Sequence, residues 1–286
     1  MERDDARPPH AESLRAGTLD AIPWLPMSTL TNGLKARLNE PEALYGLWLS
    51  FGSPAVAEAL THAGFDWLCI DMEHSPNDSR DVEHQLRAIA APHLPSEAVV
   101  RVPAHDAWLV KRVLDAGART VMFPSIDSAE QAALAVRRTR YPDAANPDGL
   151  RGVAGGVRAG AYGARRDYVQ SANAQIAVLA QIESKQALLN VEAIAATPGI
   201  DCLFVGPADL MASLGHLGDS KHPDVEAAFM KVVEAAEAAG IASGIMAMDA
   251  SEARYFHEMG FRVIALATDM TWLMRATRQA LQEARS

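Results

Sequence analysis

Two carboxylates follow neighbouring apolar runs of the sequence. Glu183 ends the run Gln175–Glu183, and Asp209 comes shortly after the run Asp201–Gly206. If these runs are adjacent strands of a parallel sheet, the two carboxylates lie within reach of one cation. Carboxylate oxygens, with no cysteine and at most one histidine nearby, suit Mg²⁺ or Mn²⁺ better than Zn²⁺. The alternative is that each carboxylate caps a helix or pairs with an arginine, and for Glu183 alone this is equally well supported.

A histidine stands in a second polar cluster, after the apolar run Asp66–Asp71. His74 is close in sequence to Asp71 and Glu73, whose charges would strengthen the imidazole as a general base. The alternative is an ordinary loop hydrogen bond. The remaining histidines lack such clustering, and we expect them to be solvated or structural; they are His10, His62, His84, His93, His105, His216, His222 and His257.

Two more charged residues need a partner. Arg101 ends an apolar run, so it must find an anion, either a carboxylate ligand or a developing oxyanion. The alternative is a structural ion pair with Glu73 or Asp71. Asp115 closes a predicted helix at its C-terminal end, where the helix dipole disfavours a carboxylate. The spacing does not identify the partner of Asp115.

The elements that would position these residues alternate along the chain. Eight runs are predicted as strands: Tyr45–Phe51, Asp66–Asp71, Ala98–Val102, Thr120–Pro124, Gln175–Glu183, Asp201–Gly206, Ile241–Ala247 and Arg262–Ala267. Eight amphipathic patterns are predicted as helices: Ala55–Ala63, Asp78–Ala91, Asp106–Ala116, Ser128–Arg138, Ser184–Ala196, Pro223–Ala239, Ser251–Met259 and Asp269–Ala284. Strand then helix, eight times over about 240 residues, predicts a (β/α)8 TIM barrel.

The barrel is expected to occupy residues 28–286 as a single domain, after an N-terminal arm over residues 1–27 that lacks periodicity. A doubly wound open sheet is the alternative, but no Gly-x-Gly-x-x-Gly follows the first run. One long segment rich in Pro and Gly, from Tyr141 to about Arg166, interrupts the pattern. Loops of that length are often lids or specificity loops, and we expect the part from Gly155 to Arg166 to shape substrate choice.

Composition excludes several other classes of protein. The 286 residues carry 26 Lys and Arg against 36 Asp and Glu, a net charge of −10, so a nucleic-acid partner is not expected. No apolar stretch reaches about 18 residues, which argues against a membrane span. The N-terminus has no apolar core of a secretory signal, and the two cysteines lie in apolar runs. We therefore expect a cytoplasmic protein with reduced thiols.

Six short motifs follow one another from about Gly46 to the C-terminus, namely GLWLS at 46–50, GFDWLCIDMEHSPND at 64–78, RYP at 140–142, RGV at 151–153, QIE at 181–183 and FVGPADL at 204–210. In the order and spacing of these motifs, the sequence resembles the HpcH/HpaI aldolase family, the metal-dependent (class II) pyruvate aldolases such as 4-hydroxy-2-oxoheptanedioate aldolase and 2-keto-3-deoxy-sugar-acid aldolases. Many members have Gly where this chain has Met72, which is expected to narrow the mouth of the barrel.

The resemblance implies a role for each site residue. His74 matches the catalytic base and Arg101 the arginine that stabilises the transition state. Asp115 matches an aspartate that supports the catalytic histidine from a neighbouring subunit. Glu183 and Asp209 match the metal ligands, while Gln181 and Ala208 match residues that line the pyruvate subsite.

The resemblance also implies reversible cleavage of a 4-hydroxy-2-oxo acid to pyruvate, or a close 2-oxo acid such as hydroxypyruvate, and an aldehyde. The cofactor would be a divalent cation, Mg²⁺ or Mn²⁺ first and Co²⁺ or Zn²⁺ next. Family members are typically hexamers, built as trimers of dimers that exchange their last helix. Small molecules, rather than a membrane or nucleic acid, are the expected partners.

Three other functions compete with this one. A Schiff-base aldolase needs a lysine at a strand end, and among five lysines only Lys185 comes close. A lyase acting on acyl-CoA 3-hydroxy acids, resembling citrate lyase, would need a basic groove, for which the chain offers scattered arginines, Arg158, Arg165 and Arg166. A non-catalytic ligand-binding barrel is the third, and the presence of base, arginine and metal ligands together argues against it.

Overall fold

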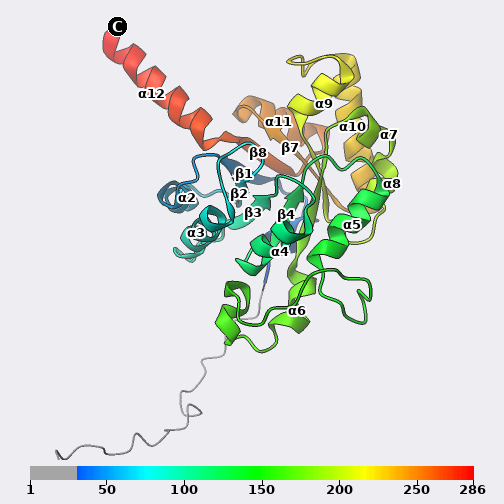
Figure 1. The fold of residues 1–286 in the computed structure, drawn as a ribbon. Helices are drawn as coiled ribbons and strands as arrows, with labels where there is room; N and C mark the ends of the chain where they lie inside the picture. The colour runs from blue at the N-terminus through cyan, green and yellow to red at the C-terminus, as the bar shows by residue number, and fades with distance from the viewer. Residues whose placement is uncertain (1–30) are drawn as a thin grey trace, which may run out of the picture.

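A closed parallel barrel forms the centre of the protein in a computed structural model that describes residues 31–286 (Figure 1). The strands pair in the order β1-β2-β3-β4-β5-β6-β7-β8, and β1 pairs with β8 to close the sheet. Their bounds are β1 Leu44–Leu49, β2 Trp67–Asp71, β3 Glu97–Arg101, β4 Thr120–Phe123, β5 Ala177–Ile182, β6 Cys202–Val205, β7 Ala242–Ala247 and β8 Val263–Thr268. The predicted (β/α)8 barrel is confirmed.

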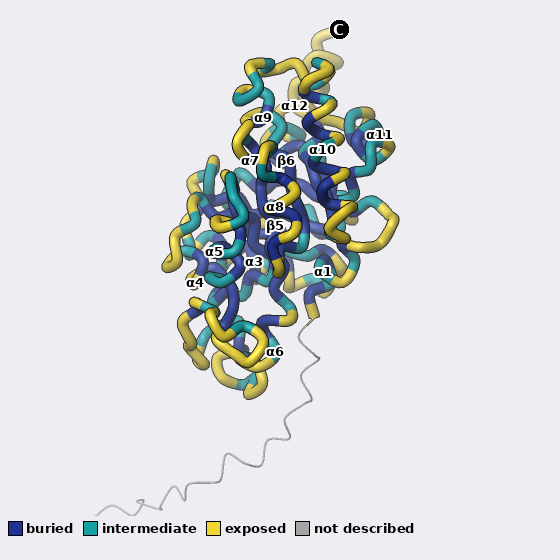
Figure 2. The backbone as a smooth tube through the Cα atoms, turned by 90° about the vertical axis from the view of Figure 1, so that its right-hand side faces the viewer, coloured by how far each residue is buried: buried dark blue, intermediate teal, exposed yellow. Residues whose placement is uncertain are grey.

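The described residues also form helices, most of which surround the barrel and cover its outer face (Figures 1 and 2). They are α1 Gly33–Arg37, α2 Pro54–Thr61, α3 Ser79–Ala90, α4 Ala107–Asp115, α5 Ala129–Thr139, the 3-10 helix η2 Arg158–Gly163, α6 Tyr168–Gln175, α7 Lys185–Leu189, α8 Val191–Ala195, α9 Pro207–Leu214, α10 Pro223–Ala239, α11 Ala250–Met259 and α12 Asp269–Arg285. No helix within residues 31–286 is long and apolar enough to cross a membrane. The predicted arm over residues 1–27 lies outside the described part of the chain.

Alternation along the strands divides the core into two layers. One set of side chains fills the barrel, and the opposite set packs under the helices. Inside the barrel, the rings of Trp48, Trp67 and Phe204 contact one another at centroid distances of 5.5–6.1 Å. Gly46 makes room for this cluster, because a Cβ there would lie 2.1 Å from the Trp67 ring. This aromatic cluster forms a solid floor beneath the mouth of the barrel.

The same alternation corrects the expectation for Met72. Its neighbours on β2 that face the barrel interior are Cys69 and Asp71, so Met72 points the other way and joins the core under the helices. Met72 therefore does not narrow the mouth.

The helices differ from the sequence-based prediction in four places. Helix α6 ends at Gln175, so the predicted strand Gln175–Glu183 begins only at Ala177. The predicted helix Ser184–Ala196 is two short helices, which meet at Asn190 in a non-helical conformation. Helix α9 was not expected, although Pro207 in its first turn and Gly215 in the left-handed conformation at its end are typical signals. The short helix α1 was also missed.

The long segment 141–166 joins the end of α5 to α6 and β5, so it lies at the N-terminal end of the barrel, below the strands. Arg158 donates to the carbonyl of Ala116 at the end of α4, at 2.6 Å, and the backbone N–H of Arg151 donates to Arg140 at 2.9 Å. Because chemistry in this fold occurs at the other end, this segment does not cover the mouth of its own barrel, and its predicted role in substrate choice stays a prediction.

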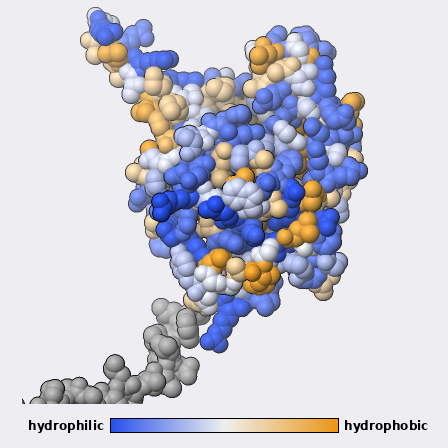
Figure 3. Space-filling model, viewed as in Figure 1, coloured by the Kyte–Doolittle hydropathy of each residue, from blue (hydrophilic) through white to orange (hydrophobic). Residues whose placement is uncertain are grey.

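The last helix, α12, extends away from the barrel at the upper left of Figure 1. Its apolar side chains are exposed, and orange atoms appear along it in Figure 3. The exposed fractions are 42% for Met270, 49% for Leu273, 40% for Met274 and 51% for Leu281. Among its residues, only Asp269 at the start is buried. A helix with this much uncovered apolar surface is typical of an interface.

Candidate active site

A cavity of about 490 Å³ opens at the C-terminal ends of the strands. Five residues that were singled out from the sequence line it: His74, Arg101, Gln181, Ala208 and Asp209. They come from β2, β3, β5 and β6, or from the segments that directly follow them. The cavity therefore has the position expected for the active site of a TIM barrel.

Arg101 is held at the cavity by two carboxylates. Its Nε and Nη2 atoms donate to the two oxygens of Asp71, each at 2.8 Å, and its Nη1 contacts Glu73 at 2.8 Å. The guanidinium also lies over the ring of Trp48, 5.3 Å from the centroid. Burial lowers the pKa of Arg101, but its bonds to Asp71 and the charge of Glu73 outweigh this and raise the pKa overall. The ion pair that we considered as an alternative therefore exists, with both acids.

This pairing leaves Arg101 able to bind a ligand. A guanidinium has five N–H groups, and three of them are accounted for by Asp71 and Glu73. One N–H on Nη1 and one on Nη2 are left, on a side chain that lines the cavity. Because Asp71 and Glu73 fix the guanidinium plane, the arrangement can present these donors to an oxyanion without reorganisation.

Asp71 also organises the segment that carries His74. Its carboxylate accepts the backbone N–H of Glu73 at 3.0 Å and the hydroxyl of Ser75 at 3.3 Å. The side chain of Asn77 donates to the Asp71 carbonyl at 2.6 Å. These hydrogen bonds to Asp71 fix the turn after β2. The turn leaves His74 exposed at the edge of the cavity. An imidazole there can exchange protons with a bound molecule.

The side chain of Glu183 lies next to Gly206, and Gly206 lines the cavity. Burial raises the pKa of Glu183 to about 7, and repulsion from Glu73 and Asp209 adds to the effect. The hydroxyl of Ser125 donates to this carboxylate at 3.3 Å. Ser125 has a φ of +51°, a strained conformation for a non-glycine residue that is common at functional sites.

Asp209 stands in the first turn of α9, directly after β6, and is exposed. Glu183 directly follows β5 and Asp209 follows the neighbouring strand β6, so the two predicted ligands come from adjacent strand ends. Oxygen donors that repel one another fit a hard divalent cation, because the cation would relieve the repulsion.

Two polar atoms at the cavity have no hydrogen-bond partner among residues 31–286. They are Nε1 of Trp48 and Oε1 of Gln181, and each side chain belongs to a residue only 2% exposed. Trp48 was not singled out from the sequence. The strand alternation around Tyr45–Phe51 was the available signal, because it places Gly46, Trp48 and Ser50 on one face.

Besides Glu183, two candidate residues do not line the cavity. Asp115 closes α4 and pairs with the buried Arg151 at 3.2 Å, away from His74 of the same chain. The Arg151 guanidinium lies 4.1 Å from the ring centroid of Tyr141, and it also donates to Tyr168 at 2.9 Å. Lys185 is exposed at the start of α7 and does not line the cavity, which removes the basis for a Schiff base.

Apolar side chains that the sequence did not single out form the opposite wall of the cavity. They are Met211 on α9, Met246 at the end of β7, Met248 after it and Phe256 on α11. Met246 is the last residue on the face of β7 that points into the barrel. The cavity thus has a charged side and an apolar side.

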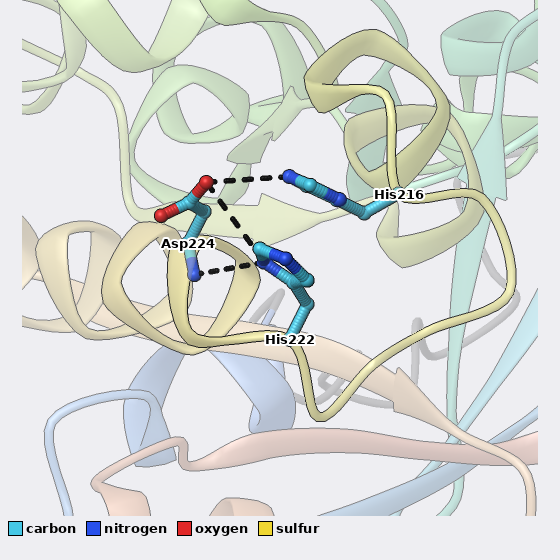
Figure 4. Close-up of side chains that lie close together, drawn as sticks. All are labelled: His216, His222 and Asp224. Carbon is cyan, nitrogen blue, oxygen red and sulfur yellow. Dashed lines mark hydrogen bonds and ion pairs between the residues drawn. The ribbon is translucent and has the colours of Figure 1, made fainter.

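A second group of potential ligands lies on the segment between α9 and α10 (Figure 4). Nε2 of His216 is 3.3 Å from Asp224, and the rings of His216 and His222 stack with centroids 3.5 Å apart. Stacked rings direct their in-plane lone pairs side by side, and Nδ1 of His222 already accepts the backbone N–H of Asp224. The group therefore caps α10, as the sequence reading of these histidines as structural suggested.

Comparison with known proteins identifies the class to which this barrel belongs. Residues 44–276 match the family model described as HpcH/HpaI aldolase/citrate lyase. A hydroxypyruvate/pyruvate aldolase of Paraburkholderia phytofirmans is 70% identical over 260 residues, covering 91% of this chain and all of the relative. A 5-keto-4-deoxy-D-glucarate aldolase of Shigella boydii is 41% identical over 261 residues, covering 91% of this chain and 97% of the relative.

A solved structure agrees with this result. The crystal structure of a HpcH/HpaI aldolase/citrate lyase family protein from Burkholderia cenocepacia superposes with a TM-score of 0.88 at 66% identity, covering 90% of this chain and all of the other. The chain belongs to the HpcH/HpaI aldolase/citrate lyase family. It is a lyase of the aldolase kind, in a family that generally depends on divalent metal, and its substrates are small-molecule acids and aldehydes.

Proposed function

We propose that this chain cleaves the C3–C4 bond of a 4-hydroxy-2-oxo acid, reversibly, to give an aldehyde and pyruvate or hydroxypyruvate. The observation that carries the proposal is the Arg101 guanidinium, which lines the cavity, is fixed by two acids and has two N–H groups that neither acid uses. In cleavage, negative charge develops on the 2-oxo oxygen, and preorganised donors of this kind stabilise such charge. The names of the two relatives support the substrate class.

Each of the site residues has a separate role in the proposed reaction. His74 accepts the proton of the C4 hydroxyl as the bond breaks, and returns it in the synthetic direction. Arg101 donates to the developing enolate oxygen. Glu183 and Asp209 would hold a divalent cation, Mg²⁺ or Mn²⁺ before Co²⁺ or Zn²⁺, and a cation there supplies a Lewis acid for the oxygens of the 2-oxo acid. Gln181 and Ala208 would line the subsite for that acid.

A neighbouring subunit would complete the site. Asp115 lies away from His74 of its own chain and is oriented by Arg151, which suits a carboxylate that supports the histidine of another subunit. The exposed apolar face of α12 offers the contact for such an assembly, and we propose a hexamer made of three dimers that exchange this helix. The cytoplasmic location stays a prediction from the sequence.

Removal of the imidazole tests the role of His74. In His74→Ala we expect aldol cleavage to fall by at least about 100-fold, while the affinity for Mn²⁺ stays within about twofold. His62→Ala, on the exposed end of α2, is the matched control and should retain full activity. Loss of Mn²⁺ binding in His74→Ala would show that the histidine is a ligand and would contradict the proposed base.

Mixing subunits tests the role of Asp115. His74→Ala and Asp115→Ala should each be inactive as pure assemblies. If Asp115 acts across the interface, dissociation and reassembly of the two together should create sites with both groups intact and should restore activity. A mixture that stays inactive, although mass spectrometry shows mixed assemblies, would refute the shared site.

A further inference from the structure

We propose that a second cavity, at the N-terminal end of the barrel, binds the carboxylate group of a small acid, and that Arg140 holds it there. The cavity has a volume of about 260 Å³ and lies between α5, the segment that follows α5, and the turn from α8 to β6. Connections from a helix to the next strand lie at the end opposite to the mouth. The two cavities share no lining residue, so the inference does not depend on the proposed function.

Arg140 is a buried cation without an ion pair. Three arginines within residues 31–286 are buried, and two of them, Arg101 and Arg151, pair with carboxylates. Arg140 is only 6% exposed, and its guanidinium makes no ion pair with any residue in this part of the chain. Charged groups in protein interiors are normally paired, because burial without a partner is costly. A buried cation that the chain leaves unpaired indicates a bound anion.

The acids whose charges act on Arg140 have other partners. Burial lowers the pKa of Arg140, and the charges of Asp201 and Asp143 do not offset this effect. Asp201 pairs with Lys35 at 2.9 Å. Asp143 accepts the backbone N–H of Asn146 at 2.7 Å and its side-chain amide at 2.9 Å. Neither carboxylate therefore serves as the direct partner of Arg140.

The guanidinium of Arg140 has one complete edge available to a ligand. Its Nη1 donates to the hydroxyl of Thr139 at 2.8 Å, and this is the only hydrogen bond of the side chain within residues 31–286. Nε and Nη2 are unbonded but keep accessible surface, in contrast to the inaccessible Nε and Nη1 of Arg151. Arg101 uses the same two atoms, Nε and Nη2, to bind both oxygens of Asp71 at 2.8 Å. The free edge of Arg140 can hold a carboxylate in the same way.

The charge of the cavity favours a monoanion. Arg137 also lines the cavity, but Asp148 pairs with it at 2.8 Å, so one positive charge is left, on Arg140. A carboxylate has one negative charge and two acceptor oxygens in a plane, which match this charge and the free edge. Phosphate has more charge and more oxygens, and Asp148 on the same wall would repel them. Ala133 and Val136 give the cavity an apolar side for the carbon atoms of the acid.

The experiment uses acetate as the probe and the metal-loaded full chain. Calorimetry measures binding, and thermal unfolding in which acetate replaces chloride at constant ionic strength measures stabilisation. Arg140→Met should weaken acetate binding at this cavity at least about tenfold, because both charged donors are lost. The Tm of the wild type should therefore rise with acetate by more than that of Arg140→Met. Acetate bound at the mouth contributes equally to both proteins, so the difference between them isolates the second cavity.

Two further variants control for loss of charge and for misfolding. Arg138→Met removes the same charge from the same helix, outside the cavity, and should bind acetate as the wild type does. Ala133→Leu keeps the guanidinium and fills the cavity from α5, so it should also lose the acetate site. This second variant tests the site even if Arg140→Met does not fold.

Three results would overturn the inference. The first is an acetate response that is the same, within twofold in affinity, in the wild type, Arg140→Met and Ala133→Leu. The second is a wild type that binds phosphate at this cavity, with loss in Arg140→Met, but does not bind acetate there. The third is a loss of acetate binding in Arg138→Met equal to that in Arg140→Met, which would show an effect of net charge alone. None of these readouts uses aldol cleavage, so the proposed function is tested separately.

Discussion

Replacement of Arg101 separates its structural role from its role in catalysis. In Arg101→Met the carboxylate of Asp71 loses two hydrogen bonds of 2.8 Å, and that of Glu73 loses one contact of the same length. The side chains of Arg101 and Asp71 are only 10% and 3% exposed, so solvent cannot replace these bonds. The variant therefore leaves an ionised carboxylate buried without its counter-charge.

The magnitude follows from the partners that remain. Breaking a buried ion pair by removing one member costs about 3–5 kcal/mol. Asp71 keeps the N–H of Glu73 and the hydroxyl of Ser75, so the lower end, about 3 kcal/mol, is expected. For a chain of 286 residues that corresponds to a fall of about 5 °C in Tm. Aldol cleavage should fall by about 100- to 1000-fold through loss of oxyanion donors.

The double variant Asp71→Asn/Arg101→Met distinguishes the two roles. Removing the negative charge of Asp71 should restore most of the lost stability, because Asp71 is the more deeply buried of the two carboxylates that lose Arg101, and Glu73 is still partly exposed to water. It should restore none of the activity, since the donors are still absent. Denaturant unfolding and an assay coupled to pyruvate release measure the two quantities.

Two results would refute this reasoning. A loss of stability below about 1 kcal/mol in Arg101→Met would mean that the ion pair does not hold the site together. A double variant that recovers activity together with stability would mean that Arg101 acts only by positioning the segment after β2.

Three further predictions concern the cation site, the excluded lysine and the last helix. Gly206→Ala should weaken Mn²⁺ binding about tenfold in calorimetry, because the new Cβ would lie 3.0–3.2 Å from the side chain of Glu183 and displace it; unchanged affinity would show that this carboxylate is not a ligand. Lys185→Ala should retain full activity, and borohydride with pyruvate should label neither this variant nor the wild type; a covalent adduct would restore the Schiff-base alternative. Leu273→Glu, on the exposed face of α12, should lower the mass of the assembly in light scattering, whereas Arg278→Glu on the same helix is the control for an added negative charge; an assembly unchanged in both would exclude α12 from the interface.

The sequence predicted the barrel because strand alternation and helix periodicity recur in every unit. It failed where those signals are short or weak. Helix α9 has only eight residues and follows β6 after a single residue, Gly206, and it was not predicted. The composition of segment 141–166 does not show at which end of the barrel it lies; its place between α5 and β5 puts it at the end opposite to the mouth.

The sequence also predicted part of the candidate site. Charged residues at strand ends are visible in the sequence, so His74, Arg101, Gln181, Ala208 and Asp209 were found, and the structure brings them to one cavity. The sequence does not show the environment of each of these groups in the folded chain. That Glu183 is buried beside other carboxylates, and that the indole of Trp48 has no partner, depends on contacts between distant strands.

Exchange of the methyl protons of pyruvate tests the central claim most directly, because it needs no assumption about the aldehyde. The full chain is treated with a chelator, then refilled with Mg²⁺, Mn²⁺ or Co²⁺, and deuterium incorporation is followed by NMR. We predict that exchange stops in the stripped protein and returns with metal. Exchange that continues at the same rate after complete removal of metal would contradict the account.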